Sequence, residues 1–522
     1  MASSGEDHTW DVIVIGAGIA GMTAAYRILQ ADQNARVLVL EAKDRVGGRT
    51  DTLEMNAALG KDVWDLGGQW VGRTQHHMLW LMEELGITKY PQYTAGRKVL
   101  RLSDDKIRSY TTSIPTLPLM SLIDLHRFMS AVDRMAKTVP IDDPRKAVYA
   151  EEWDSITLET LMRRLMWTQM AKDCINIGIY QLVGVRLKSL SLLQWLHYTN
   201  SGGSMEALVD TEEGGANEFK MKGGAMQICE RLRDAVGEKN VLIGEPVTEI
   251  DQSDEDVVSV TTATGKNFRC RYIISAAPLH CSVDIDYIPH QPTVRASLAL
   301  HSPVGHLFKF VISYKKAFWR EKGYSGELVS TGGQPVLPGC TSGPLQLIYD
   351  ASTPNGNPAL VGFYANGREW SNKTEEECKG AVLNALAEIF GPEAKQPIDF
   401  KQKDWGKEPY NGGCPVNVMT PGAISYFYDG LTQPFDRIHW AGTESATIWR
   451  GYMSGAVQSG MRAADEVLDR LWPGLPRDNL LKELDDMRSD KTRQIPRWLS
   501  LSGAVAVGLL FSYAVRRYWL TL

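Results

Sequence analysis

The sequence has few features of a secreted, nucleic-acid-binding or repetitive protein. Its 522 residues include only seven cysteines, an odd number with no C-x-x-C pair, which favours reduced intracellular thiols over a disulfide framework or a zinc site. The 56 Lys and Arg residues do not outnumber the 62 Asp and Glu residues, so no nucleic-acid partner is expected. The polar N-terminus has neither the apolar run of a secretory signal nor the arginines of a mitochondrial presequence. This length predicts two or three domains with sizeable cores.

A glycine-rich turn near the N-terminus is the most informative motif present. Gly16, Gly18 and Gly21 stand between an apolar run and a helical stretch, and Glu41 ends a second apolar run. In a βαβ unit such glycines permit a tight turn, close approach to a pyrophosphate and close helix packing. Glu41 is expected to accept hydrogen bonds from a ribose 2′-hydroxyl, which disfavours NADP and leaves FAD or NAD.

A second set of paired glycines follows the second apolar run. Gly47 and Gly48 precede Arg49, and Gly67 and Gly68 precede Gln69. A single NAD-binding unit does not need these turns, whereas a long dinucleotide with a bulky ring system must be held along its whole length. The second motif therefore favours FAD.

One long apolar run lies at the C-terminus. Residues 498–515 are uncharged and mostly apolar, and arginines and aromatic residues bracket them. A helix of this length is about 27 Å long, close to the roughly 30 Å hydrocarbon core of a bilayer. Basic and aromatic flanks are typical of membrane interfaces, so we expect a transmembrane tail anchor rather than a buried core helix.

The residue pattern in the middle of the chain changes from helical to β-like. Helical periodicity is found at residues 156–170, 174–183 and 189–195. Short β-like runs separated by turn residues follow at 241–250, 257–262 and 272–275. An antiparallel meander is expected there.

Four further motifs narrow the interpretation. Small residues surround Gly442-Thr443-Glu444, Tyr452 and Met453 precede another helical stretch, and Cys414 follows two glycines. Lys309 is the lone charge in an apolar strand, and Trp405 precedes the cysteine. With the glycine motifs, these segments resemble the flavin-containing monoamine oxidases of the animal mitochondrial outer-membrane type, from about residue 11 to 471.

The resemblance implies an α/β fold in which a discontinuous Rossmann-like FAD-binding domain adjoins a mixed α+β substrate domain and a C-terminal transmembrane helix. The FAD-binding domain is expected at residues 8–90, 220–294 and 398–470. The substrate domain is expected at 91–219 and 295–397, with a linker at 471–497 and the anchor at 498–515.

The resemblance also implies which residues bind FAD, including Val247, whose backbone would hold the adenine end. The expected cofactor-binding residues are Gly16, Gly18, Gly21, Glu41, Gly48, Arg49, Gly68, Gln69, Val247, Trp405, Cys414, Gly442, Thr443, Glu444, Tyr452 and Met453. Cys414 stands where the family bonds its cysteine sulfur to the 8α-methyl group of FAD. An ordinary buried free cysteine is the alternative.

Lys309 and Tyr452 are the expected catalytic residues. Lys309 matches the family lysine that contacts flavin N5 through water and assists oxygen activation, and its alternative is a structural lysine reaching the surface. Tyr452 matches one of two tyrosines that face the flavin, but Pro415 occupies the position of the other. The sequence therefore retains half of the family's aromatic cage. The expected substrate-pocket residues are Gln181, Leu182, Asn217, Leu347 and Phe363.

The activity implied is FAD-dependent oxidative deamination of amines by O2, giving imine and aldehyde, ammonia and hydrogen peroxide, with primary monoamines as expected substrates. No metal is required. A polyamine or L-amino-acid oxidase of the same superfamily is an alternative, and so is a non-catalytic membrane-tethered flavoprotein. An amino-acid substrate would need an arginine and a polyamine would need acidic residues, and the sequence does not place Arg186, Glu212 or Glu213.

The expected partners are a small amine, O2 and, through the tail, a lipid bilayer. By resemblance the location is the mitochondrial outer membrane, with the body facing the cytosol. Assembly as a homodimer is left open.

Overall fold

The computed structural model describes residues 9–112 and 115–489. Contacts divide the chain into two units, Met1–Arg477 and Asp478–Leu522. The described part of the second unit contains helix α16 (Leu480–Asp486).

An eight-stranded sheet carries the first glycine turn. Its order is β10-β2-β1-β13-β12-β11-β14, and β20 pairs with β13. The strands are β1 (Thr9–Ile15), β2 (Val37–Leu40), β10 (Val241–Leu242), β11 (Val247–Asp251), β12 (Val258–Thr262), β13 (Asn267–Ser275), β14 (Asp286–Ile288) and β20 (Ile438–Trp440). Strands β10, β2, β1, β13 and β20 pair with one another in parallel. Strand β12 pairs antiparallel with both β11 and β13, which gives the expected antiparallel meander. The predicted α/β class is confirmed.

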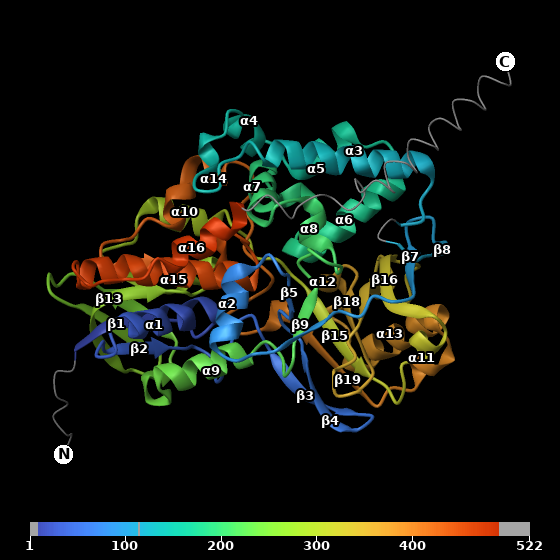
Figure 1. The fold of residues 1–522 in the computed structure, drawn as a ribbon. Coiled ribbons are helices and arrows are strands. Elements are labelled where there is room, and N and C mark those ends of the chain that lie inside the picture. The colour runs from blue at the N-terminus through green and yellow to red at the C-terminus, as the bar shows by residue number, and fades with distance from the viewer. Residues whose placement is uncertain (1–8, 113–114, 490–522) are drawn as a thin grey trace. The chain divides into compact units, whose positions relative to one another are not determined.

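Helices cover this sheet. Helix α1 (Ile19–Ala31) lies beside α15 (Met453–Leu471) and α9 (Gln227–Val236), and α2 (His76–Glu84) lies against α15 (Figure 1). The approach of α1 to α15 is close, because a Cβ added at Gly460 would lie 2.3 Å from the Ala20 carbonyl oxygen. This packing joins the two ends of the first unit's chain around the sheet.

A second, seven-stranded sheet has the order β19-β15-β18-β17-β16-β7-β8. Its strands are β7 (Arg97–Arg101), β8 (Ile107–Tyr110), β15 (Phe308–Ser313), β16 (Tyr324–Gly332), β17 (Leu345–Asp350), β18 (Ala359–Tyr364) and β19 (Asp399–Asp404). Neighbours are antiparallel except β16 and β7. Helices α11 (Phe318–Glu321), α12 (Gly367–Trp370) and α13 (Glu375–Phe390) pack on it, the last beginning with a capping box of Thr374 and Glu377.

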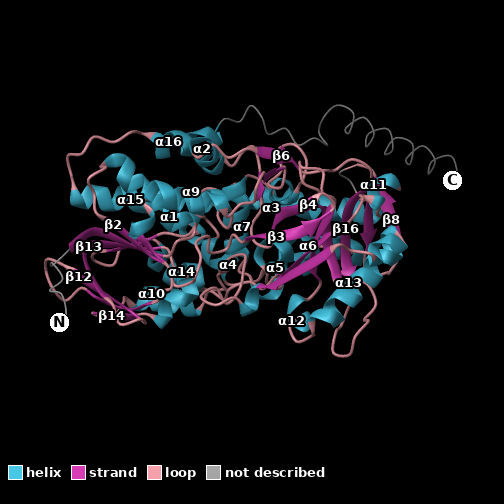
Figure 2. Ribbon diagram, turned by 90° about the horizontal axis from the view of Figure 1, so that it is seen from below, coloured by secondary structure: helices cyan, strands magenta, loops and turns pink. Residues whose placement is uncertain are grey.

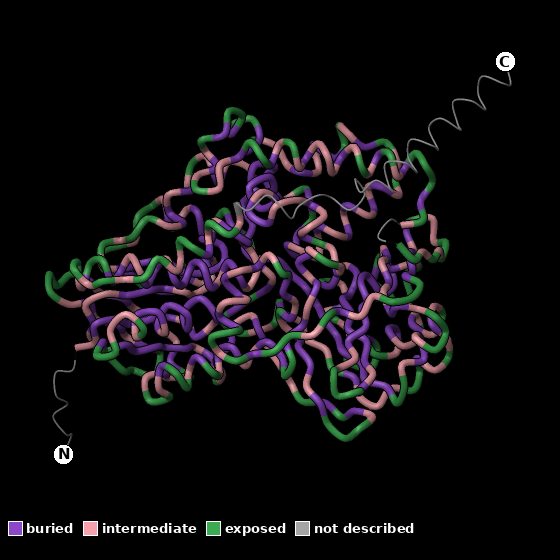
Figure 3. The backbone as a smooth tube through the Cα atoms, in the orientation of Figure 1, coloured by how far each residue is buried: buried purple, intermediate pink, exposed green. Residues whose placement is uncertain are grey.

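Further helices lie on one side of the two large sheets, at the top of the first unit in Figure 1. These are α3 (Leu119–Ala136), α4 (Ala150–Asp154), α5 (Leu158–Leu165), α6 (Gln169–Val183), α7 (Leu192–Gly202), α8 (Met205–Val209), α10 (Thr293–Leu300) and α14 (Ala423–Phe427). In Figure 2 the strands of the large sheets gather at opposite ends of the first unit, with α4, α5 and α7 between them. Both sheets and these helices contain many buried residues (Figure 3).

Two small sheets bring further segments to the site. The hairpin of β3 (Thr52–Ala57) and β4 (Gly60–Asp65) follows the second glycine turn. Strand β9 (Phe219–Met221) pairs with β5 (Trp70–Val71) and with β6 (Lys89–Pro91).

The helix predicted at residues 156–170 is wrong in its length, because the chain breaks between α5 and α6. The Asp124 carboxylate accepts hydrogen bonds from the backbone N–H groups of Trp167 (2.8 Å) and Thr168 (2.7 Å). Asp124 is fully buried, so this contact with distant chain fixes the break.

Within residues 9–112 and 115–489, we find no helix with both the length and the apolarity needed to cross a bilayer. The anchor predicted at 498–515 lies outside the described residues.

Candidate functional site

A cavity of about 790 Å³ runs between the glycine turns of the first sheet and the strands of the second. Of the residues predicted from the sequence to bind cofactor or substrate, all but Glu444 line it. A cavity of this size, lined mainly by apolar groups with a few convergent polar ones, is typical of a ligand site.

The first glycine turn forms one end of the cavity. Gly16 adopts a φ of +99° directly after β1, a conformation that favours glycine. A Cβ at Gly21 would lie 2.0 Å from the Gly16 carbonyl oxygen, so only glycine lets α1 begin so close to the strand. The N-terminus of α1 therefore faces the cavity with free amides and a partial positive charge, as an anion requires.

Glu41 lies at the end of β2 beside this turn. Its carboxylate accepts hydrogen bonds from the backbone N–H groups of Ala17 (2.6 Å) and Lys43 (3.0 Å). Burial raises the pKa of Glu41, and these two bonds act in the opposite direction. The carboxylate is thereby fixed in orientation within the cavity wall, where a ribose hydroxyl could donate to it.

The second glycine turn lies against the first. Gly18 and Gly47 form an isolated β-bridge, and Gly47 and Gly48 have φ values of +112° and +57°. A Cβ added at Gly18 would lie 3.8 Å from the Gly48 Cα atom. Two strips of bare backbone thus border the cavity, and a long dinucleotide can lie against both.

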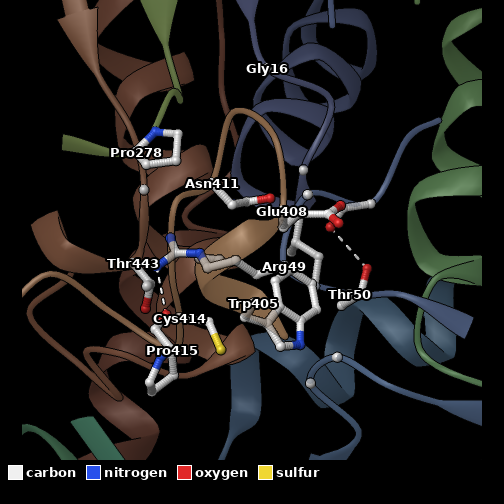
Figure 4. A pocket seen from close by; sticks show the side chains of 18 of the residues that line it. Gly16, Arg49, Thr50, Pro278, Trp405, Glu408, Asn411, Cys414, Pro415 and Thr443 are labelled. Carbon is white, nitrogen blue, oxygen red and sulfur yellow. Dashed lines mark hydrogen bonds between the residues drawn. The ribbon is translucent and has the colours of Figure 1, made fainter. Parts of the chain in front are cut away.

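Arg49 links this turn to the C-terminal part of the first unit. Its guanidinium donates to both carboxylate oxygens of Glu444, at 2.6 and 3.1 Å. It also donates to the Pro415 carbonyl oxygen at 2.7 Å, and both Arg49 and Pro415 are labelled in Figure 4. Burial alone would raise the pKa of Glu444, but Arg49 holds it below its usual value. Glu444 thus reaches the site through Arg49 and does not line the main cavity.

Cys414 and Trp405 point into the same part of the cavity (Figure 4). The Cys414 N–H donates to Gly305 (2.9 Å), and the Trp405 indole donates to the Leu66 carbonyl oxygen (2.9 Å). Burial raises the pKa of the Cys414 thiol to about 12. Arg49 is among the charges that favour the thiolate.

A charge network holds the loop that precedes Cys414. The Glu408 carboxylate accepts hydrogen bonds from Lys43 (2.6 Å) and Arg45 (2.9 Å) and pairs with Lys403 (2.7 Å). Lys43 also donates to the Asn411 side chain. The segment after β2 is thereby fastened to the cysteine loop.

Lys309 occupies β15 with its side chain 2% exposed. Its Nζ donates to the Gly67 carbonyl oxygen (2.9 Å) and to Gln69 Oε1 (3.1 Å). Nζ lies 5.5 Å from the Trp70 ring centre and 5.6 Å from that of Phe363. Burial lowers the pKa of Lys309 to about 7. The side chain therefore does not snorkel to the surface, and its charge depends on what fills the cavity.

The far end of the cavity is aromatic. Trp70 packs edge-on against Tyr349 with ring centres 5.4 Å apart, and Tyr452 lies 5.9 Å from Tyr198. The Tyr452 hydroxyl donates to the Leu208 carbonyl oxygen (2.9 Å), which fixes its ring. Pro415 also lines the cavity.

Two amides and three apolar side chains complete this end. Gln181 donates to Gln346 (2.5 Å), and Asn217 donates to the Val209 carbonyl oxygen (3.2 Å). Leu182, Leu347 and Phe363 lie among them along the cavity wall.

Sequence reasoning did not single out Trp70, Tyr198 or Tyr349 as site residues. Tyr349 could have been found, because it lies two residues after Leu347 in a strand and therefore on the same face. Tyr198 comes from a helix with no local motif, and only the packing of that helix beside Tyr452 brings it to the cavity.

Known proteins are similar to this chain in sequence and in fold. A family model described as flavin containing amine oxidoreductase matches residues 19–468. Amine oxidase [flavin-containing] B of Homo sapiens is 36% identical over 481 residues, which cover 89% of each chain. Amine oxidase [flavin-containing] A of Canis lupus familiaris is 34% identical over 472 residues, covering 89% of this chain and 86% of the relative.

Solved structures also match. Cyclohexylamine oxidase from Brevibacterium oxydans superposes with a TM-score of 0.81 at 31% identity, over 89% of this chain and all (100%) of the other. Wild-type putrescine oxidase bound to putrescine superposes with a TM-score of 0.80 at 27% identity, over 89% and 100% of the two chains.

Proposed function

Because the chain belongs to the flavin-containing amine oxidase family and is an amine oxidase, we propose that it oxidatively deaminates primary monoamines with O2. The products are an imine that hydrolyses to aldehyde, ammonia and hydrogen peroxide. Family membership implies FAD as cofactor, and we propose that residues 8–90, 220–294 and 398–470 bind it while 91–219 and 295–397 shape the substrate side.

The aromatic, largely uncharged far end of the cavity is the observation that carries this proposal. Of the charged residues that line the described cavity, Lys309 is the one whose Nζ lies within 6 Å of the Trp70 and Phe363 ring centres. Such a wall accepts a neutral amine with an apolar substituent and disfavours a second charge on the substrate.

The positions of four charged residues weigh against the alternative substrates. Arg186 is exposed and does not line the cavity, and Arg49, which does, is committed to Glu444. No other arginine lines the described cavity to receive an amino-acid carboxylate. Glu212 pairs with Lys98 and Glu213 with Arg73, so neither acid is available to a polyamine in this arrangement.

The residues present fit FAD. The cavity offers the α1 N-terminus and facing glycine turns for a pyrophosphate, Glu41 for a ribose, and the space beside Cys414 and Trp405 for a ring system. FAD, when bound, accepts two electrons from the amine and delivers them to O2. The protein excludes water with the aromatic wall, orients the amine beside Tyr452, and places the Lys309 ammonium where negative charge develops on oxygen.

An amine panel tests the proposal. Purified holoenzyme is supplied with benzylamine, phenethylamine and hexylamine, with putrescine and spermidine, and with L-leucine, while peroxide is measured. We expect the highest kcat/KM among the first three. Preference for a diamine or an amino acid would overturn the proposed substrate class, and no peroxide or anaerobic flavin bleaching with any amine would favour a non-catalytic flavoprotein.

We also propose that Cys414 is bonded through sulfur to the 8α-methyl group of FAD. Its burial beside Trp405 and the glycines at 412 and 413 support close approach of a ring. Acid precipitation should leave the yellow chromophore with wild-type protein, and a Cys414→Ala variant should release its FAD. Complete release from the wild-type protein would show that the bond is absent.

For the tail, we propose a transmembrane anchor at 498–515 that holds the enzyme on the mitochondrial outer membrane, facing the cytosol. The run's length and its basic, aromatic flanks support this. Deleting residues from 495 onward should release an FAD-containing enzyme from the membrane fraction. Full-length protein that fractionates as soluble would contradict the anchor. The homodimer is a separate hypothesis that sedimentation of the released enzyme tests.

A further inference from the structure

Arg450 is buried two residues before Tyr452 in the sequence and has no carboxylate partner among the described residues. Its side chain is 2% exposed, and Nη1 lies 2.7 Å from His197 Nδ1. His197 Nε2 lies 2.9 Å from the Ile141 carbonyl oxygen, so Nε2 carries the proton and Nδ1 accepts from Arg450. The imidazole in this arrangement is neutral and does not balance the charge of the guanidinium.

The Arg450 guanidinium also contacts an aromatic ring, with its Cζ 5.7 Å from the centre of the Tyr428 ring. Neither this ring nor His197 supplies a counter-charge. Nε and Nη2 make no hydrogen bond, and Arg450 forms no ion pair with any carboxylate of the described residues. Arginine stays protonated in proteins. A buried cation that cannot lose its proton and has no acid beside it requires another counter-charge.

Arg450 lines a small cavity. It measures about 10 Å³ and is lined by Arg450, Gln194 and Ser302, among others. Gln194 and Ser302 are 4% and 0% exposed, and Gln194 Oε1 and Ser302 Oγ also lack partners in the described chain. The volume corresponds to one particle of about the size of a water molecule.

Besides the Glu444 carboxylate, the polar side chains around this cavity can act as donors. Arg450 offers two N–H positions and Ser302 a hydroxyl, and the Gln194 amide offers N–H when its side-chain amide is turned over, since the two orientations are nearly isosteric. Donors on several sides and an unbalanced positive charge suit a small monovalent anion.

The carboxylate of Glu444 also lines this cavity, but its charge is already matched. Arg49 donates to both of its oxygens, at 2.6 and 3.1 Å, and the Asn417 N–H donates at 3.1 Å. Arg450 therefore remains the charge without a counterpart.

We propose that the cavity beside Arg450, Gln194 and Ser302 binds a chloride ion. Gly451 and Tyr198 line both this cavity and the main one, and Tyr198 lies 5.9 Å from Tyr452. The bound anion fixes the backbone that presents Tyr452. This inference is independent of the substrate class proposed above.

Bromide substitution tests the site directly. Crystals of the wild-type holoenzyme are grown with bromide as the halide, and anomalous diffraction is measured at the bromine edge. We expect an anomalous peak within hydrogen-bonding distance of Arg450 Nε and Nη2. Density there without anomalous signal would assign a water molecule, and either this result or no density would overturn the proposal.

Thermal stability gives a second test in solution. Tm of the holoenzyme is measured at constant ionic strength while chloride replaces gluconate. A bound anion should raise Tm by about 2 °C for each tenfold increase in chloride above Kd.

The chloride response should vanish in Arg450→Gln and persist in Arg164→Gln, a matched change at an exposed arginine of α5. An equal response in both variants, or none in the wild-type protein, would overturn the site. The bromide experiment needs no variant, so the proposal does not depend on Arg450→Gln folding.

Discussion

The two ends of the cavity are built in different ways. Near Gly16 and Glu41 the wall is backbone, glycine and paired charge, and the residues lie close together in the sequence. Around Tyr349 and Tyr452 the wall is aromatic, and its side chains come from strands and helices far apart in the chain. The first end can hold a shared group, whereas the second can vary with the substrate, because its side chains are not fixed by a common backbone motif.

The largest effect is expected where the backbone allows no side chain. Gly21→Val places a Cβ 2.0 Å from the Gly16 carbonyl oxygen, so strand and helix must move apart and the dinucleotide loses its turn. We expect almost complete loss of bound FAD, measured by flavin absorbance per mole of protein.

The control for this change is Gly380→Ala in α13, where an added Cβ meets nothing within 4 Å. Gly380→Ala should keep its FAD. Normal flavin content in Gly21→Val would show that the turn does not determine binding.

Lys309→Met should affect the rates of the two half-reactions unequally. Removing the ammonium should slow reoxidation of the reduced enzyme by O2 about a hundredfold, roughly 3 kcal/mol, with little effect on anaerobic reduction by amine. Stopped-flow absorbance measures both steps. Equal slowing of the two would return Lys309 to a structural role.

The same variant should also change how the stability of the apoprotein depends on pH. Because burial lowers the pKa of Lys309 from 10.5 to about 7, the unfolded state binds more protons between these values, and stability rises with pH across that interval. Methionine should remove this rise and should not destabilise the protein at neutral pH. Denaturant titrations at pH 7 and 9 measure it.

A smaller effect is expected from the network that fastens the cysteine loop. Glu408→Gln should destabilise the protein by about 2 kcal/mol after allowance for solvent screening, since Lys43, Arg45 and Lys403 lose their shared carboxylate. Burial opposes ionisation of Glu408, yet Lys403 and Lys43 hold its pKa at about 2 against a usual 4.5.

The stabilising contribution of Glu408 is therefore present above pH 4.5 and is lost as pH falls toward 2. Glu408→Gln should flatten the stability profile in that interval and lower the fraction of flavin that stays with acid-precipitated protein. Unchanged profiles would mean that the network does not hold the loop.

The smallest change concerns the aromatic end. Leu347→Ala should alter the ratio of kcat/KM for a bulky and a small amine by about tenfold, because it enlarges the pocket by a few carbon atoms. FAD content should not change. Leu59→Ala, at a side chain 70% exposed, is the control, and the same ratio in both variants would remove Leu347 from the substrate wall.

Much of the fold could be predicted because its signals are local. The first glycine turn stands between a strand and a helix as its spacing indicates, and the meander of β11, β12 and β13 follows from short β-like runs. The break between α5 and α6 could not be predicted, because the Asp124 carboxylate that stabilises it lies some forty residues upstream. Tyr198 could not be predicted as a site residue for the same reason, because only tertiary packing brings its side chain to the cavity wall.

The strand order of the first sheet also affects the biosynthesis of the enzyme. Strand β20 (Ile438–Trp440) pairs with β13, and Gly442 and Thr443, which follow it, line the same cavity as Gly16. At about 5–20 residues per second, translation leaves the nascent chain without this last strand for tens of seconds. The cofactor therefore meets a complete site only after almost the whole first unit has been translated, and a chain cut short before β20 presents half a binding site to the quality-control machinery of the cell.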